Sequence, residues 1–211
     1  KYRLQIHSEH FQEVKHNLLG IKGSKLEDIK TVRSHSQAIG QCSKIISKQK
    51  LIPIISADTA GSAKFISEKK DTSESAIASD LAAKIYNLEI IKSNIEDEPG
   101  NITRFFIMGQ NVVHPEVKNK KYITSCIFKL KSVPAALYKA LGGFATNGVN
   151  LLKLESFSVK NTFDQVNFYI DVDGHMESQS VKKAFEELGF HTEKLDILGV
   201  YEAHLFRLNN K

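Results

Sequence analysis

Residues 51–70 read LIPIISADTAGSAKFISEKK, and this stretch decides the fold class. The apolar run over residues 51–56 is typical of a buried β-strand. Asp58 or Thr59 then provides an N-cap, and the residues that follow predict a helix up to residue 70. A strand that passes directly into a helix is the repeating unit of an α/β fold with a mostly parallel sheet.

The same alternation continues on both sides of this unit. Ile39, Cys42, Ile45 and Ile46 recur at helical spacing, which predicts one buried helical face. Asp80 is expected to cap a later helix. The expected strands end near residue 35 and span residues 75–79 and 88–95, and the expected helices span residues 36–50 and 80–87.

The composition indicates a globular chain without a nucleic-acid or membrane partner. Of its 211 residues, 41% are hydrophobic and 25% are charged, which is enough to bury a core. The net charge of +5 comes from scattered lysines, and the densest basic run, residues 118–121, falls in a candidate linker. No apolar run reaches the about 20 residues of a membrane span, and no signal-peptide pattern follows Lys1. We therefore expect a cytoplasmic protein, and a fragment whose true start precedes Lys1.

Neither cysteines nor histidines predict a metal or cofactor site. Cys42 and Cys126 lie far apart and are expected to be buried free thiols. His7, His10 and His16 crowd the N-terminus but lack the three or four convergent ligands of a metal site. No nucleophile elbow, dinucleotide fingerprint or phosphate loop occurs, so no cofactor is expected.

A linker is expected at residues 111–121, NVVHPEVKNKK, because this segment shows no sustained helical or strand period. It separates a first domain, residues 1–110, from a second, residues 122–207. In the second domain the order of expected elements is βαββαβ, the ferredoxin-like arrangement with one open sheet face. Its strands are expected at 122–130, 149–159, 165–174 and 192–201, its helices at 134–148 and 178–189, and a loop, KNTFD, at 160–164.

Polar residues follow the expected strands of the first domain. In open α/β sheets, ligands bind outside the carboxyl ends of the strands, where helix N-termini attract anions. Two interpretations stay open: these residues cap helices, or they form a cleft for an anionic substrate. The candidate substrate-binding residues are Ser34, His35, Asp58, Thr59, Ala60, Gly61 and Ser79.

Residues 96–109, EDEPGNITRFFIMG, place Arg104 inside an apolar strand. A buried arginine is costly unless it meets an anion, because its charge is not lost by deprotonation. Arg104 could turn outward and pair with one of the acids at 96–98, Glu96, Asp97 or Glu98. Alternatively, its planar fork could hold a substrate carboxylate, with the Thr103 hydroxyl beside it.

The whole chain resembles prephenate dehydratase joined at its C-terminus to an ACT regulatory domain. The order and spacing of several segments carry this resemblance, with NITRFFIMG looking like the family's Thr-Arg-Phe signature. These segments are HNLLG at 16–20, VRSHSQAIGQC at 32–42, ADTAGSA at 57–63, AIASDLAAKIY at 76–86, NITRFFIMG at 101–109 and PAALYKALGGFATNGVNLLKLES at 134–156.

The resemblance implies conversion of prephenate to phenylpyruvate with loss of water and carbon dioxide, without a cofactor. It implies that Thr103 is the hydrogen-bond donor or acid toward the leaving hydroxyl. Arg104 would hold a substrate carboxylate, and Phe105 would pack against the ring or shape the pocket. It also implies a two-lobed, periplasmic-binding-protein-like catalytic domain. The family's first lobe, with its Gly-Pro-x-Gly-Thr segment, has no counterpart here, so this chain alone is expected to turn over substrate poorly.

Regulation by L-phenylalanine is implied for the ACT domain, with two departures from the family pattern. Residues 135–138 read Ala-Ala-Leu-Tyr where the family typically has Gly-Ala-Leu-Val, and residues 155–158 read Glu-Ser-Phe-Ser in place of Glu-Ser-Arg-Pro. The implied effector residues are Ala135, Ala136, Leu137, Asn150, Leu151, Glu155 and Ser156. A homodimer or homotetramer is expected, with strands 122–130 and 149–159 as candidate contacts. Arogenate dehydratase, or an amino-acid sensor without catalysis, are the alternatives.

Overall fold

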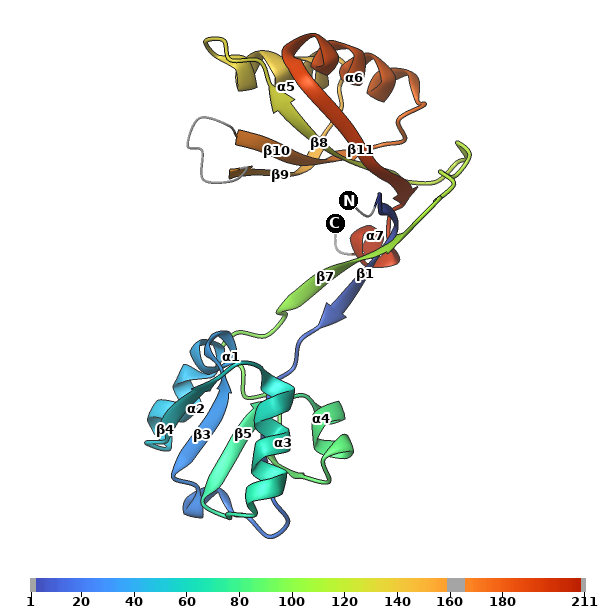
Figure 1. Cartoon of the computed structure of the whole chain (residues 1–211). Helices are drawn as coiled ribbons and strands as arrows, with labels where there is room; N and C mark the ends of the chain where they lie inside the picture. Colours follow the sequence, from blue (N-terminus) through green and yellow to red (C-terminus); the bar gives the residue numbers. More distant parts are fainter. Residues whose placement is uncertain (1–2, 159–165, 210–211) are drawn as a thin grey trace. The chain divides into compact units, whose positions relative to one another are not determined.

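The computed structural model describes residues 3–158 and 166–209 (Figure 1). These residues form two compact units. The first unit spans Gln12–Thr103, and the second combines the described residues up to Phe11 with those from Arg104 onward. The expected first domain, residues 1–110, does not coincide with either unit, because its two ends pack with the second unit.

A five-stranded mixed sheet forms the centre of the first unit, with strand order β4-β3-β5-β2-β6. Strand β3 runs parallel to β4 and β5, whereas β2 runs antiparallel to β5 and β6. The elements are β2 (Asn17–Gly20), η1 (Leu26–Asp28), β3 (Thr31–His35), α1 (Ser36–Gln41), α2 (Ser43–Lys48), β4 (Ile52–Ser56), α3 (Thr59–Lys69), β5 (Glu74–Ala78), α4 (Asp80–Ile85) and β6 (Glu89–Lys92).

Strand β2 is what makes the sheet mixed, and it was absent from the sequence prediction. All four of its residues are buried, including Leu18 and Leu19. A short apolar run of this kind carries no alternation, and its pattern does not reveal the direction in which the strand pairs.

A strand forms within residues 51–56, as predicted, but it is not the buried strand that was expected. Strand β4 lies at the edge of the sheet, and the side chains of Ile52 and Ile55 are about 60% exposed. Pro53 lies within this strand and has no N–H to donate, which is compatible with an edge position. The proline was therefore the feature of the sequence that distinguished an edge strand from an interior one.

The predicted helical face of residues 39–46 is confirmed as part of the core. Cys42, Ile45 and Ile46 are buried against Val32 and Ile77 of the sheet. Each fully buried aliphatic side chain contributes about 1.5–3 kcal/mol relative to an exposed one. The helix itself is interrupted, because the backbone of Cys42 separates α1 from α2.

The second unit has the predicted βαββαβ order, built on an antiparallel sheet with strand order β11-β8-β10-β9. Helix α6 continues to His191 instead of ending at Gly189, and the predicted KNTFD loop lies outside the described residues. The six elements are β8 (Tyr122–Leu130), α5 (Ala136–Thr146), β9 (Leu151–Ser158), β10 (Val166–Asp173), α6 (Gln179–His191) and β11 (Thr192–Glu202).

Helices cover one face of this sheet and β1 covers part of the other, so the face that was expected to be open is only partly so. Helices α5 and α6 pack on one face around Phe128, Phe144 and Leu188 (Figure 1). On the other face, Ile6 packs with Ile123 and Tyr201. Ile6 belongs to β1 (Gln5–Glu13), which pairs with β7 (Ile102–Gly109) in a two-stranded sheet, and the short helix α7 (Leu205–Asn209) follows β11.

Gly199 on β11 permits the close approach of β1. A Cβ atom at this position would lie 2.3 Å from the backbone oxygen of Ile6, so any larger residue would force the two strands apart.

Of the two strands expected to form contacts between subunits, β8 lies inside the four-stranded sheet and β9 lies at its edge. Residues 112–118 have no regular structure, as predicted for the linker. None of the described helices is long and apolar enough to cross a membrane.

Candidate active site

A cavity of about 490 Å³ opens in the first unit where strands β3 and β4 end. This volume lies within the range of about 300–1,000 Å³ that is usual for small-molecule sites. It forms at the carboxyl ends of two parallel strands, as expected for an α/β sheet. The lining residues are Val14, His16, His35, Gln37, Ala38, Gln41, Ala57, Asp58, Thr59, Asn101 and Thr103.

The cavity brings together His35, Asp58, Thr59 and Thr103 of the predicted site residues. Ser34, Ala60, Gly61 and Ser79 do not line it. Ser34 is fully buried, and its Oγ donates to the backbone oxygen of Ile77 at 2.7 Å, which ties β3 to β5. Its hydroxyl is therefore used within the sheet and is not available to a substrate.

The helix that follows each strand is capped by a side chain of the protein. Ser79 caps α4 by accepting from the N–H of Ala82 at 3.2 Å, so Asp80 is the first helical residue and not the cap. At α3, Oδ1 of Asp58 accepts from the N–H of Gly61 at 2.5 Å. The positive end of α3 is thus already occupied by a carboxylate, which argues against the anion site expected there.

His35, and not Ser34, caps the first helix of the site. Its Nδ1 accepts from the N–H of Gln37 at 3.3 Å. Because Nδ1 is the acceptor, the proton of the neutral imidazole resides on Nε2. Helix α1 has only six residues and contributes little dipole of its own.

Sequence analysis did not identify a hydrogen-bonded triad in the wall of the cavity. Oε1 of Gln41 lies 2.8 Å from Nε2 of His16 and accepts from Nδ2 of Asn101 at 3.2 Å. His16 is buried. All three residues lie in segments that carry the family resemblance. Those segments were the feature of the sequence that could have pointed to these residues as part of the site.

Strand β7 directs its first side chains alternately to opposite sides. Thr103 and Phe105 are exposed, whereas Arg104 and Phe106 are half-buried. Successive residues of a strand face opposite ways, so the Thr103 hydroxyl and the Arg104 guanidinium do not lie side by side. Thr103 lines the cavity, and neither Arg104 nor Phe105 does.

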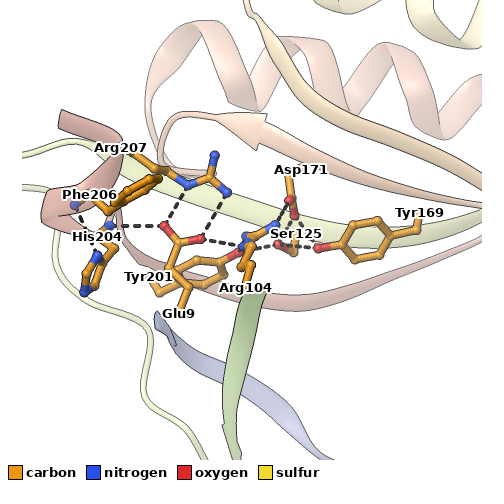
Figure 2. A network of polar contacts seen from close by, with 9 residues as sticks. All are labelled: Glu9, Arg104, Ser125, Tyr169, Asp171, Tyr201, His204, Phe206 and Arg207. Carbon is orange, nitrogen blue, oxygen red and sulfur yellow. Dashed lines mark hydrogen bonds and ion pairs between the residues drawn. The ribbon is translucent and has the colours of Figure 1, made fainter. Parts of the chain in front are cut away.

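Arg104 is held by carboxylates of the second unit (Figure 2). Its Nε donates to Glu9 at 2.7 Å, Nη1 donates to Asp171, and Nη2 donates to the hydroxyl of Tyr201 at 2.8 Å. The Arg104 side chain is 16% exposed, and those of Glu9 and Asp171 are fully buried. Of the two interpretations left open, an outward-facing arginine paired with an acid at 96–98 is therefore wrong. In the other interpretation the fork holds a substrate carboxylate, but in the structure protein groups fill it.

The acidic residues expected near Arg104 have other partners. Glu96 accepts from the N–H of His16 at 3.1 Å. Asp97 accepts from the N–H groups of Ser43 and Lys44, both at 2.9 Å, and so caps helix α2. Burial alone would raise the pKa of the Asp97 carboxyl. The hydrogen bonds from Ser43 and Lys44 outweigh this effect, so its pKa lies below the usual value.

Two tyrosines complete the network around Arg104 (Figure 2). Tyr169 donates to Asp171, and Oγ of Ser125 donates to the same carboxylate at 2.5 Å. Burial raises the pKa of Tyr169 and of Tyr201 well above the usual range, so both phenols keep their protons. Burial opposes the charge of Arg104, yet the hydrogen bond to Asp171 raises the pKa of the guanidinium overall.

The predicted effector residues lie at the start of α5 and along β9. Ala135 has φ 56° and ψ 30°, a left-handed conformation that favours glycine, where the resemblance places a family glycine. Ala136 lines a cavity of about 480 Å³ with residues 129–134, and the other six predicted residues do not line it. Glu155 instead forms an ion pair with Lys153 at 3.0 Å.

The described residues contain no group of three or more His, Cys, Asp or Glu side chains that could hold a metal ion. The polar groups of the cavity are therefore imidazole, amide and hydroxyl groups and the Asp58 carboxylate. The imidazole, amide and hydroxyl groups can donate hydrogen bonds to a leaving oxygen, whereas the carboxylate can only accept them, and all of these groups can orient a polar substrate.

Comparisons with known proteins agree on one family. A model of the family described as prephenate dehydratase matches residues 1–112. A Komagataeibacter europaeus protein named bifunctional N-acyl-homoserine lactone acylase/prephenate dehydratase is 42% identical over 97% of this chain and 73% of its own length. Arogenate dehydratase/prephenate dehydratase 1 of Arabidopsis thaliana is 36% identical over 98% of this chain but only 56% of its own length. The structure of prephenate dehydratase in complex with L-Phe from Arthrobacter aurescens has a TM-score of 0.87 at 28% identity, and covers 96% of this chain and 67% of that one.

Proposed function

Because the chain belongs to the prephenate dehydratase family, we propose that it forms the part of a dehydratase that converts prephenate to phenylpyruvate, with loss of water and carbon dioxide. The observation that carries this proposal is the position of Thr103 in a polar cavity with His35 and Thr59. Aromatisation of the ring drives the reaction, so the protein needs only to orient the substrate and assist the departing hydroxyl.

Thr103 is the group that we assign to the leaving hydroxyl. A threonine hydroxyl is neutral at physiological pH, and it can donate a hydrogen bond to the oxygen as the carbon–oxygen bond breaks. Asn101 and Gln37 provide amide groups in the same cavity. No Lys or Arg is among the lining residues of this cavity, so none of them offers the substrate carboxylates a Lys or Arg cation. This arrangement supports the expectation of poor turnover by this chain alone.

The assignment is tested by comparing Thr103→Ala and Thr103→Ser in the full-length enzyme. We expect the alanine variant to lower kcat by about 10²–10⁴-fold, the usual contribution of a positioned proton donor. The serine variant retains the hydroxyl and should recover part of this loss. Thr72→Ala, at an exposed turn, is the matched control and should leave kcat unchanged. Near-normal turnover by a folded Thr103→Ala variant would refute the role.

Arogenate is the alternative substrate, since the Arabidopsis relative is named for both activities. Prephenate and arogenate differ at the side-chain carbonyl or amine, and the residues that line the cavity include both hydrogen-bond donors and acceptors. Side-by-side assays of the two substrates give the preference as a ratio of kcat/KM. An amino-acid sensor without catalysis is the third candidate, and phenylalanine binding in calorimetry with no turnover of either substrate would support it.

The 42% identical relative also carries the name of an N-acyl-homoserine lactone acylase. Because that relative covers 97% of this chain, we include acylase activity as a second candidate function. Release of the fatty acid from an N-acyl-homoserine lactone, measured beside the dehydratase assay, decides whether this chain shares that activity.

For the second unit, we propose an ACT regulatory domain that responds to L-phenylalanine. The βαββαβ order supports this assignment, as does the ligand named for the Arthrobacter structure. The effector residues are proposed to be those at 135–137, 150–151 and 155–156. We further propose that the first unit belongs to a two-lobed catalytic domain. The expected cytoplasmic location stays a prediction.

A homodimer or homotetramer is proposed through the edge strand β9. Leu152, Leu154 and Phe157 on this strand are each about 40% exposed, and an unpaired strand edge readily pairs with another. Light scattering measures the assembly directly. A stable monomer at micromolar concentration would contradict this contact.

A further inference from the structure

A smaller cavity of about 250 Å³ lies in the second unit, on the sheet face opposite α5 and α6. It is smaller than the about 300–1,000 Å³ typical of sites for drug-sized ligands, and its size suits a single small metabolite. Most of its surface is apolar, with walls formed by Phe11, Ile123, Leu152, Phe206 and Leu208. None of these residues lines the candidate active site.

The aromatic side of this cavity is held in place by defined contacts. The rings of Phe11 and Phe206 stack with centroids 4.8 Å apart and planes inclined by 23°. The guanidinium carbon of Arg207 lies 5.2 Å from the centre of the Phe11 ring. An ordered wall of this kind lowers the entropic cost of binding a flat apolar group.

Arg207 is oriented toward the cavity by Glu9. Its Nε donates to Oε1 of Glu9 at 2.8 Å, and its Nη2 donates to Oε2 at 3.1 Å. The remaining nitrogen, Nη1, points away from Glu9 (Figure 2). A guanidinium fixed along one edge can still donate to a carboxylate from its other nitrogen.

Two further charges border the cavity without a partner of their own. Lys121 and Asp173 both line it, and neither forms an ion pair with any residue that the structure describes. Lys121 is exposed and Asp173 is half-buried. The cavity therefore combines an apolar interior with two cations and one carboxylate at its border.

We propose that this cavity binds an apolar α-amino acid. The ligand carboxylate pairs with Arg207 and Lys121, its ammonium pairs with Asp173, and its side chain enters the space beside Phe11. A simple carboxylate would leave Asp173 facing a like charge, and a simple amine would leave Lys121 without an anion. The site is separate from the proposed effector residues at 135–137, 150–151 and 155–156, and it does not depend on the proposed dehydratase activity.

The test is a titration of the full chain with L-phenylalanine, followed by methyl NMR. Resonances of Ile123, Leu152 and Leu208 should shift and saturate. The ligand 3-phenylpropionate, which lacks the ammonium, should bind at least about 10-fold more weakly, as expected for a lost charge-assisted hydrogen bond. Because the readout is binding, loss of dehydratase activity has no bearing on the result.

Asp173→Asn is the decisive variant. It should weaken L-phenylalanine at least about 10-fold and leave 3-phenylpropionate unweakened, since only the ammonium contact is removed. Asp196→Asn, on an exposed carboxylate paired with Lys194, is the matched control and should bind like the wild type. Ala203→Leu, which fills the cavity, should abolish the shifts while circular dichroism shows an intact fold.

Three results would overturn the proposal. The first is equal binding of both ligands with no effect of Asp173→Asn, which would make this a carboxylate site. The second is shifts confined to Leu137 and Leu151, which would place the amino acid at the proposed effector residues alone. The third is no shift of the three cavity methyl groups at millimolar ligand.

Discussion

Arg104 donates from Nη1 to the carboxylate of Asp171, a residue 67 positions further along the chain. Both side chains belong to the second unit, whereas Thr103, the preceding residue, belongs to the first. The arginine of the Thr-Arg-Phe sequence is therefore part of a charged interior network. Its structural role can be separated experimentally from substrate binding.

Replacing Arg104 should destabilise the protein. Arg104→Ala leaves Glu9 with one partner fewer and Asp171 without its cation, and breaking a buried ion pair costs about 3–5 kcal/mol. Urea unfolding measures this change. The double variant with Asp171→Asn should lose less than the sum of the single variants, because the two residues interact directly.

A substrate-binding role for Arg104 would give a different result. KM would rise, while the free energy of unfolding would change by less than about 1 kcal/mol, the scale of an exposed ion pair. Arg104→Lys sharpens the distinction, because it keeps the charge but cannot donate to Glu9, Asp171 and Tyr201 from one planar fork.

Gly199→Ala should be strongly destabilising. The added methyl group would lie 2.3 Å from the backbone oxygen of Ile6, and relief requires movement of β1 or β11. Overpacking of this kind typically costs about 1–3 kcal/mol. Gly142→Ala is the matched control, since a Cβ there meets no atom within 4 Å and alanine favours the helix. Equal melting temperatures for the two variants would contradict the close approach.

Ala135→Gly should stabilise the protein. A left-handed residue other than glycine costs about 1–2 kcal/mol, and the greater flexibility of glycine when unfolded offsets about 0.5–1 kcal/mol of this gain. A rise in the free energy of unfolding of about 0.5–1 kcal/mol is expected from the difference. Ala145→Gly, in an exposed position of the same helix, should lower it instead. The same sign for both variants would exclude this explanation.

The thiol of Cys42 should resist alkylation in the native protein. Burial, followed by the negative charges of Asp97 and Glu96, raises the pKa of Cys42 to about 12. Below that pH the thiol stays protonated, and only the thiolate is nucleophilic. At pH 8 we expect no reaction with iodoacetamide in native buffer and rapid reaction in urea, followed by mass spectrometry. Rapid labelling of the folded protein at Cys42 would contradict its burial.

The sequence predicted those parts of the fold that depend on local patterns. The strand-to-helix passage at Asp58 and the βαββαβ order both follow from residue spacing and capping, and the structure has them. Strand β2 and the exposure of β4 were missed, because an apolar run looks the same in the middle of a sheet and at its edge. Pro53 was the one local indication.

Local patterns also predicted part of the candidate site. Motifs and the ends of strands pointed to Thr103, His35 and Asp58, and these three residues line one cavity. The partners of Arg104 could not be predicted from local patterns, because Glu9 lies 95 residues away in the sequence and no periodicity links the two residues. The His16–Gln41–Asn101 triad likewise joins three separate segments, which only the folded chain brings together.

The division of the chain inside β7 affects how the protein can be dissected. A recombinant piece ending at residue 110 would carry Arg104 without Asp171, and Ile6 without Tyr201. Its β1–β7 pair would be left as an isolated two-stranded ribbon, which is marginally stable in water. Activity lost on excising that piece would therefore report exposed charges and unsupported strands, and would not by itself measure what the C-terminal portion contributes to regulation.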